Sequence, residues 1–367
     1  MSPASASQPP PPANLIADQQ AAGENAATEG AGNPEIAGLI SRHHYKSPDY
    51  KTVLKKTISA EILKHYLADL DPYSRLISAE QVRFNENRAK YRRIGPGLDY
   101  LIDRDKVLGV PVFDGPLYKQ GLKNAIRIEH INDQVIDYDE FDSYRFLDDF
   151  SEGDRVIISY RHNDTAALET LSLQAASYQY EPARFYRLGK TAVLEIRRFR
   201  TGKNRLIRDA LQNAADAERL VLDLRFSPGG DIYAMTDWLS LFLPEGMEVA
   251  RLRRQNDLAP LVLKTLSGRV NLPVPVVILV SRFTASSAEI FARVLAASLP
   301  SALTIGEHTR GKCLAQNTFR LSNGDSLSLS TYEVELAGGL CNNTSLQPNV
   351  EIPGVEYSNL ADLLDKF

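Results

Sequence analysis

The sequence is poor in cysteine and has no long hydrophobic run, and each shortage excludes a class of protein. Only two of its 367 residues are cysteines, Cys313 and Cys341, too few for a disulfide-rich scaffold. The longest apolar stretch, near Val274–Val280, is too short for the ~20 residues of a membrane-spanning helix. No basic and apolar signal segment opens the sequence. We therefore expect either a cytosolic protein or a chain whose leader has been removed.

Positive charge is absent from the beginning of the chain. Residues 1–41 contain no Lys or Arg and four acids, whereas the remainder balances at 42 basic and 42 acidic residues. A nearly neutral body offers no electrostatic footprint for nucleic acid. The six His and two Cys show no spacing typical of zinc ligands, so we expect no metal. A hydrophobic fraction of 43% is ordinary for a globular protein.

The first quarter of the chain divides into a tail and a helical segment. Residues 1–34 are rich in Ala, Pro, Ser, Gln and Gly, which predicts a disordered tail. We expect a helical N-terminal segment over 35–93. Asp71-Pro72 should end its main helix, and a further helix should run from Ser78 to about Arg92. One face of the main helix is indicated by residues at i, i+4, i+7 and i+8: Ile58, Ile62, His65 and Tyr66.

The rest of the chain predicts two kinds of structure and a terminal helix. Residues 94–178 contain short β-like runs and a helix-length insert at Tyr138–Phe150, which indicates a small β-rich domain. Strand-like and helix-like runs alternate over 179–352, which favours an α/β core with crossover connections. Asn323-Gly324 between two strand-like runs predicts a hairpin. An amphipathic helix is expected over 353–367, docked on the core or on another subunit.

Three segments of the α/β region carry residues suited to chemistry. Leu222–Gly230 leads from a strand into a Pro-Gly-Gly turn that can expose N–H groups to an anion. Thr284–Ile290 places serines at a helix N-terminus, where the macrodipole stabilises negative charge. Gly311–Gln316 contains Lys312, which could act as a base only if burial lowered its pKa from ~10.4 to roughly 7–8. Each segment alone has an ordinary explanation as a turn, an N-cap or a surface lysine.

In this order, the segments resemble those of the C-terminal processing peptidases, or tail-specific proteases, which are serine endopeptidases with a Ser–Lys dyad. The resemblance covers nearly all of residues 50–352. It implies a mixed α/β serine-peptidase core with an inserted β-rich PDZ-like domain, and no cofactor. Its motifs, in sequence order, are Leu70–Arg75, Leu222–Gly230 with Leu241–Gly246, Thr284–Ile290, Gly306–Gln316 and Leu346–Val350.

The resemblance implies a role for each matched residue. Ser286, three residues before Glu289, matches the nucleophile, and Lys312 matches the general base. Ser287 is the rival nucleophile, because it restores the family's usual spacing to the lysine. Gln316 matches a glutamine that orients the lysine. The oxyanion hole would use backbone N–H groups of Ser287 and of a glycine, Gly229 or Gly230.

The β-rich domain is similar to a PDZ domain, which binds extended C-terminal peptides by β-augmentation. The similarity lies in Gly115–Leu122 and Ile128–Asp133. Gly97 and Leu98 are the candidate cradle for a peptide carboxylate. Ala125-Ile126 departs from the family's usual Gly-Asp. The implied partner is a protein or peptide with a free C-terminus, with an adaptor or a second copy as possible further partners.

Several alternatives remain open from the sequence. Cys313 and Cys341 could form a disulfide in an oxidising compartment or stay reduced. Arg310 could lower the pKa of the lysine or point outward. A Ser-His-Asp mechanism would use His308 with Asp223 or Asp231, without the usual nucleophile elbow.

The alternative functions are a peptide-binding pseudoprotease and a latent protease that an adaptor activates. The family resemblance implies a periplasmic or other extracytoplasmic location.

Overall fold

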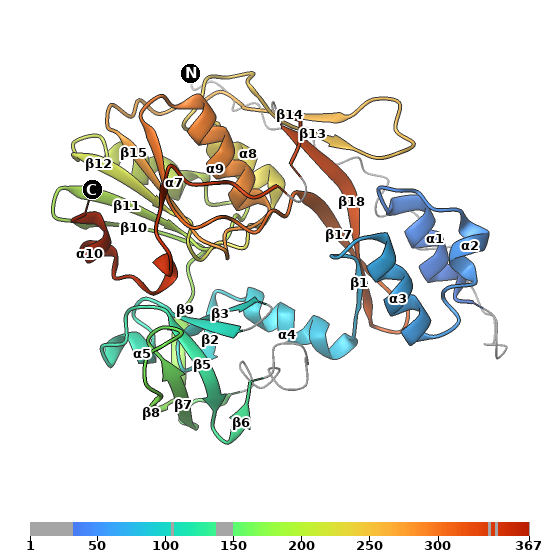
Figure 1. Ribbon diagram of the computed structural model, residues 1–367, viewed down its shortest axis with the longest axis horizontal. Helices are drawn as coiled ribbons and strands as arrows, with labels where there is room; N and C mark the ends of the chain where they lie inside the picture. Colours follow the sequence, from blue (N-terminus) through green and yellow to red (C-terminus); the bar gives the residue numbers. More distant parts are fainter. Residues whose placement is uncertain (1–31, 104–105, 137–149, 337–338, 342–343, 367) are drawn as a thin grey trace, which may run out of the picture. The chain divides into compact units, whose positions relative to one another are not determined.

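The computed structural model describes residues 32–103, 106–136, 150–336, 339–341 and 344–366 (Figure 1). Most of the predicted tail and of the Tyr138–Phe150 insert, together with Phe367, therefore lies outside the described residues. The chain divides into two compact units. We call 1–77, 239–269 and 314–340 the first unit, and 78–238, 270–313 and 341–367 the second unit.

The first unit combines helices with a mainly antiparallel sheet. Its helices each begin at a side-chain cap, from Asn33, Asp49 and Ser59, that satisfies a free backbone N–H. The helices are α1 (Pro34–His43), α2 (Tyr50–Leu54) and α3 (Ala60–Leu70). The strands are β1 (Arg75–Ile77), β13 (Glu248–Arg253), β14 (Leu261–Lys264), β17 (Leu314–Arg320), β18 (Ser326–Leu336) and β19 (Gly339–Leu340).

Strand β18 organises this sheet. It pairs with β17 across the Asn323-Gly324 turn, which confirms the predicted hairpin. It also pairs with β1, β13 and β19. The sequence predicted helix around β1 and placed the hairpin with the α/β core. The structure instead groups the hairpin with the N-terminal helices, because β1 pairs with β18 over Ser326–Ser328.

The helical face that the sequence indicated for α3 is not the face that the structure buries. Leu63 and Leu67 are buried against β18, whereas Ile58 and Ile62 are 47% and 37% exposed. The cause is the position of the cap. Ser59 accepts a hydrogen bond from the N–H of Ile62 and begins the helix, so Ile58 precedes it and cannot set its period.

A β-rich body forms part of the second unit. Its buried cluster includes Leu98, Leu117, Ile126 and Ile158. The preceding helix, α4 (Ala79–Ala89), starts at a Ser78 capping box and ends three residues earlier than predicted. The strands are β2 (Arg92–Gly95), β3 (Leu98–Asp103), β4 (Lys106–Pro111), β5 (Ile126–Ile131), β6 (Gln134–Val135), β7 (Arg155–Arg161), β8 (Glu169–Gln174) and β9 (Ala176–Gln179), with α5 (Pro116–Lys119) after β4.

The other part of the second unit is a mostly parallel sheet, as the alternating sequence pattern predicted. The strand order is β10-β11-β12-β15-β16-β20, and only the β10–β11 pair is antiparallel. The strands are β10 (Ala183–Leu188), β11 (Thr191–Ile196), β12 (Arg219–Asp223), β15 (Val276–Val280), β16 (Ala302–Gly306) and β20 (Val350–Glu351). The helices are α7 (Asn204–Asn213), α8 (Ile232–Leu239) and α9 (Ser287–Ser298), and α9 packs against β15 and β16.

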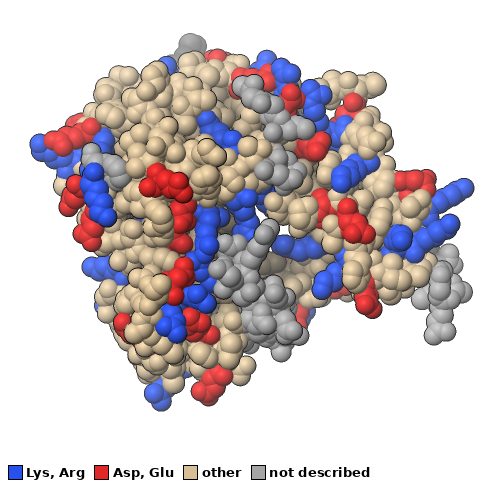
Figure 2. Space-filling model, in the orientation of Figure 1, with Lys and Arg blue, Asp and Glu red and all other residues tan. Residues whose placement is uncertain are grey.

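None of the described helices is long and apolar enough to cross a membrane. Acidic and basic side chains alternate along the left-hand side of the view in Figure 2. The net charge of −4 is therefore not the result of one large acidic field on that side.

The C-terminal segment docks on the parallel sheet of its own unit. It contains a short 3₁₀ helix, η4 (Val355–Tyr357), and α10 (Leu360–Leu364). Leu360, Leu363 and Leu364 pack against strand residues of one sheet face, among them Val193 and Val221. The amphipathic pattern of this segment is thus satisfied within the chain.

Replacing Leu363, which is 1% exposed, by alanine should lower the free energy of unfolding by about 2–5 kcal/mol, because it leaves a cavity against the sheet. Urea denaturation measures this. The exposed Lys366→Ala should change the free energy by less than about 0.5 kcal/mol. Equal effects of the two variants would contradict the docking.

Candidate active site

Three loops meet at one edge of the parallel sheet in the second unit. Residues 224–230 follow β12, residues 281–286 follow β15, and residues 307–312 follow β16. These strands are parallel neighbours, so their carboxyl ends share an edge. Ligand sites of open α/β sheets lie at such an edge. The three segments that the sequence analysis singled out are therefore brought together by the sheet order.

Hydrogen bonds join the first two loops. The Thr284 hydroxyl donates to the Leu224 carbonyl at 2.8 Å, and the N–H of Ala285 donates to the Ser227 carbonyl at 3.0 Å. Both loops are buried at these residues. The backbone just before Ser286 is thus held against the turn that leads to Gly229.

Ser286 occupies an unusual backbone position. It is the N-cap of α9, and its φ of 56° and ψ of −127° lie in a region that non-glycine residues rarely adopt. Such strain persists only where the surroundings enforce it, and it gathers at functional sites. Ser286 is partly exposed, whereas Ser287 is 2% exposed and donates its hydroxyl proton to the Gly230 carbonyl at 2.9 Å.

Gly229 lies directly against the serine. A Cβ at Gly229, where φ is +100°, would stand 2.7 Å from the Ala285 carbonyl oxygen and 2.9 Å from the Ser286 Cβ. No side chain fits this space. Within the described residues, no hydrogen bond takes up the backbone N–H of Gly229, Gly230 or Ser287. These donors can receive an anion beside Ser286.

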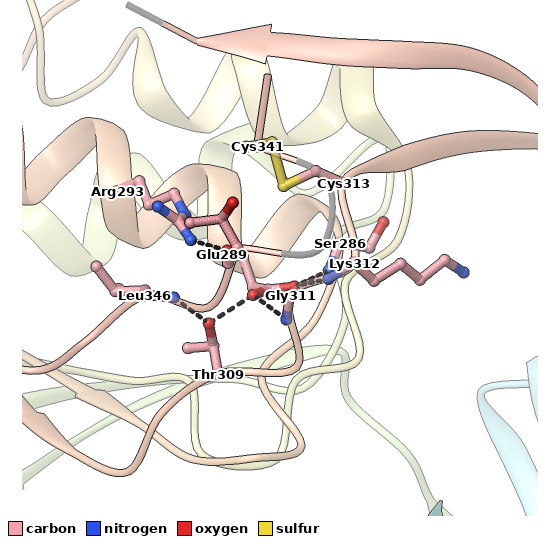
Figure 3. The surroundings of a disulfide bond; sticks show 10 residues. Ser286, Glu289, Arg293, Thr309, Gly311, Lys312, Cys313, Cys341 and Leu346 are labelled. Atoms are coloured by element: carbon pink, nitrogen blue, oxygen red, sulfur yellow. Dashed lines mark hydrogen bonds between the residues drawn. A yellow bond between two sulfur atoms is a disulfide. The ribbon is translucent and has the colours of Figure 1, made fainter. Parts of the chain in front are cut away.

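A single buried carboxylate, that of Glu289, joins the second and third loops (Figure 3). Its Oε2 accepts hydrogen bonds from the backbone N–H of Ser286 at 3.1 Å and of Lys312 at 2.8 Å. Its Oε1 accepts from the N–H of Gly311 at 2.7 Å and from the Thr309 hydroxyl. Four donors converge on one side chain, and they fix both loops at the start of α9.

Lys312 and the disulfide lie side by side. Lys312 is partly buried, and its side chain points away from the Glu289 carboxylate in Figure 3. The next residue, Cys313, is bonded to Cys341 with a Cα–Cα distance of 5.5 Å. Both cysteines are buried. The bond ties the chain directly after the lysine to a segment 28 residues later.

The histidine alternative receives no support from the described geometry. Both carboxylate oxygens of Asp223 are taken by the buried guanidinium of Arg225, and Asp231 caps the N–H of Ala234. His308 is exposed. Within the described ranges, neither aspartate forms an ion pair with this histidine, and no three His, Cys, Asp or Glu side chains are close enough to hold a metal ion.

Three predicted site residues lie elsewhere in the fold. Gln316 is on β17 in the first unit, where its Nε2 donates to the Tyr73 carbonyl at 2.9 Å. Gly97 lies in the β-rich body at a φ of +81°, and a Cβ there would stand 2.7 Å from the Pro116 Cδ. Its neighbour Leu98 begins β3 and is fully buried.

Sequence reasoning missed the contacts of Glu289, which served only as a reference for counting back to the serine. The signal that could have found it is weak: an acid three residues after an N-cap serine is typical of a capping box. That pattern predicts a bond to the N-cap N–H and no bond to Gly311 or Lys312, which are more than 20 residues away.

Comparisons with known proteins show what this chain is similar to. Residues 190–352 match the model of peptidase family S41. Over this segment the chain is similar to the S41 peptidases. A CtpA-like serine protease of Staphylococcus aureus is 21% identical over 88% of this chain and 64% of its own length. A carboxyl-terminal-processing protease of Synechocystis is 26% identical over 74% and 66%. The chain thus spans less than two thirds of these S41 relatives.

The mixed α/β fold of this chain is also found among solved structures. The photosystem II D1 C-terminal processing protease superimposes with a TM-score of 0.65 at 18% identity, over 87% of this chain and 91% of that one. At this identity the likeness concerns the fold alone.

Replacing Glu289 by glutamine should lower the free energy of unfolding by about 1–3 kcal/mol at neutral pH, because an amide NH₂ would face backbone donors. Burial raises the pKa of Glu289 against the opposing effect of its hydrogen bonds. The folded state therefore binds this proton more tightly than the unfolded state, and the contribution to stability falls as the pH rises from the ordinary pKa to the raised one.

Urea denaturation of both proteins between about pH 4 and about pH 8 measures this dependence. The advantage of the wild type over Glu289→Gln should shrink as the pH rises. If the advantage of the wild type instead grew with pH, the pKa of Glu289 would not be raised in the folded state.

Proposed function

We propose that the chain is a serine endopeptidase of the C-terminal processing type, with Ser286 as nucleophile and Lys312 as general base. The observation that carries the proposal is the Glu289 carboxylate, which binds the backbone N–H groups of both residues. A nucleophile and its base must stay within hydrogen-bond reach. One buried anion that holds both backbones at the start of α9 supplies such a constraint. The names of the S41 relatives agree with this function.

The surroundings favour Ser286 over its neighbour as nucleophile. Ser286 has the strained backbone, partial exposure and the position at the N-terminus of a helix, where negative charge is stabilised. The Ser287 hydroxyl is buried and already donates to a carbonyl, so attack would cost it that hydrogen bond.

Lys312 would act in its neutral form. A lysine loses its charge at neutral pH only where burial outweighs its attraction to acids. Lys312 is partly buried, and its backbone N–H is one of the four donors that bind Glu289, so its backbone is held in place. Arg310 is exposed, which favours the outward position of this residue. Gln316 would orient the lysine, as the family resemblance implies.

The reaction would pass through an acyl-enzyme. Neutral Lys312 takes the hydroxyl proton as the Ser286 oxygen attacks the scissile carbonyl, and Lys312-H⁺ then gives that proton to the leaving amine. The N–H groups of Ser287 and of Gly229 or Gly230 would hold the oxyanion. Water then cleaves the ester, with the lysine again as base.

The β-rich body would act as the PDZ-like peptide-binding domain over residues 94–178. Among the described strands, β3 lies at the edge of its sheet, so an extended peptide can add beside it. The tight Gly97 turn directly before this strand would receive the carboxylate. Substrates would therefore be proteins or peptides with a free C-terminus.

The disulfide supports an extracytoplasmic location such as the periplasm. Disulfides persist in oxidising compartments and are rare where thiols are kept reduced. Cys313 and Cys341 are joined and buried beside the proposed base. If this disulfide is structural, the protein needs an oxidising compartment for full function.

Ser286→Ala and Lys312→Ala should each reduce cleavage of an unfolded protein substrate to background, because each removes one member of the dyad. Ser287→Ala is the matched control. It should retain cleavage within about tenfold, because its hydroxyl is engaged with Gly230.

Cleavage is measured from product masses and initial rates, and circular dichroism checks that each variant is folded. Loss of cleavage in Ser287→Ala with retention in Ser286→Ala would reassign the nucleophile. Binding of tails without any cleavage by the folded wild type would favour the pseudoprotease.

Replacing Cys313 and Cys341 together by serine should lower the free energy of unfolding by roughly 3–4 kcal/mol, as the loop-entropy model gives for this separation. The turn after Lys312 would lose its tether, so cleavage should slow at temperatures where the variant stays folded. Unfolding curves and rates under the same conditions test both effects. If cleavage were unchanged in a variant that mass spectrometry shows to lack the bond, the disulfide would have no role in activity.

A further inference from the structure

A buried carboxylate in the first unit fixes the turn between α3 and β1. Asp71 is 4% exposed and follows the last residue of α3. Its Oδ1 accepts hydrogen bonds from the N–H of Tyr73 at 2.8 Å and of Ser74 at 2.9 Å. These two bonds close the turn over Asp71–Ser74 in the manner of an Asx-turn. The direction of the Tyr73 carbonyl is set by this turn.

Three side chains complete the coordination of Asp71. The Ser330 hydroxyl donates at 2.8 Å, the Ser74 hydroxyl at 2.5 Å and the His44 Nε2 at 2.8 Å. The His44 Nδ1 accepts from the N–H of Lys46, so the ring proton lies on Nε2. Burial alone would raise the pKa of Asp71, but these bonds outweigh it and hold the pKa well below its usual range.

The centre of this cluster is the carboxylate and not the histidine. Both Ser74 and His44 donate to Asp71, so no relay from serine through histidine to aspartate exists here. The cluster instead binds β18 at Ser330, between the stretch that pairs with β1 and the stretch that pairs with β13. Ser330 donates its N–H to the Ser74 oxygen at 3.0 Å, and its carbonyl accepts from the N–H of Tyr45 at 2.9 Å.

Gln316 lies next to this cluster within the same unit. It is the cross-strand partner of Ser330, at an irregularity in the β17–β18 register. Its Nε2 donates to the Tyr73 carbonyl at 2.9 Å. A backbone carbonyl can only accept, so a flipped amide would set two oxygens against each other. The Tyr73 carbonyl therefore fixes the direction of both the nitrogen and the oxygen of this amide.

We propose that Asp71 is a positioning residue for the peptidase reaction, because it fixes the Tyr73 carbonyl that orients the Gln316 amide. The inference rests on the proposed function, in which Gln316 orients the lysine base. Asp71 touches no reacting atom. Its effect on catalysis passes through the turn and through Gln316, and should vanish when that side chain is absent.

The test is a double-mutant cycle on peptide cleavage with Asp71→Asn, Gln316→Ala and the double variant. Asp71→Asn should lower kcat about tenfold and change KM less than about twofold, because orientation of the base matters after the substrate is bound. The double variant should match Gln316→Ala within about twofold. Val53→Ala, a fully buried change in the same unit, is the control, and should lower the melting temperature without lowering kcat.

Independent effects, in which the two losses of kcat multiply, would overturn the inference and leave the peptidase function intact. An unchanged kcat in Gln316→Ala would overturn both the inference and the role of Gln316, whereas the function itself stands or falls with Ser286→Ala. If Asp71→Asn does not fold, Pro72→Gly loosens the same turn and keeps the carboxylate. It should show the same dependence on Gln316.

Discussion

The Glu289 carboxylate is the interaction on which the proposed active site depends. It is buried at the start of α9 and accepts hydrogen bonds from residues of two loops that follow different strands. Without an acceptor at this point, the N–H groups of Ser286, Gly311 and Lys312 would be buried or half-buried donors that lack this hydrogen bond, which costs free energy. The same anion thus satisfies the backbone and sets the spacing between the proposed nucleophile and base. The geometry that the proposed chemistry needs thus follows from a requirement of the fold.

Each unit uses a buried acid in this way. Asp71 in the first unit accepts hydrogen bonds from backbone N–H groups of the turn that binds Gln316. Glu289 in the second unit accepts them from the loop that contains Lys312. Irregular segments cannot satisfy their donors through ladders, so a carboxylate with several lone pairs is an efficient partner. The Asp223–Arg225 pair is different, because there a buried cation neutralises the acid and reaches two carbonyls of the C-terminal segment.

In the proposed mechanism the oxyanion donors and the lysine base need different kinds of structural support. The oxyanion donors of Gly229, Gly230 and Ser287 need only a rigid backbone, which the bonds between the loops provide. The lysine needs a long side chain to be held in one place and in its neutral form. The disulfide at Cys313 directly follows that lysine and limits the motion of its turn. Covalent and electrostatic constraints therefore meet at Lys312.

Local sequence patterns were enough to predict the alternation of strands and helices, the Asn-Gly hairpin and the three segments with serine, lysine and glycines, because periodicity, caps and turns are local properties. It failed where partners are distant. The buried face of α3, strand β1 and the roles of Glu289 and Asp71 depend on contacts such as Asp71 with Ser330, 259 residues away. These features could be read only from the folded chain, because a buried acid and a surface acid look the same in a sequence until the fold shows which donors surround them.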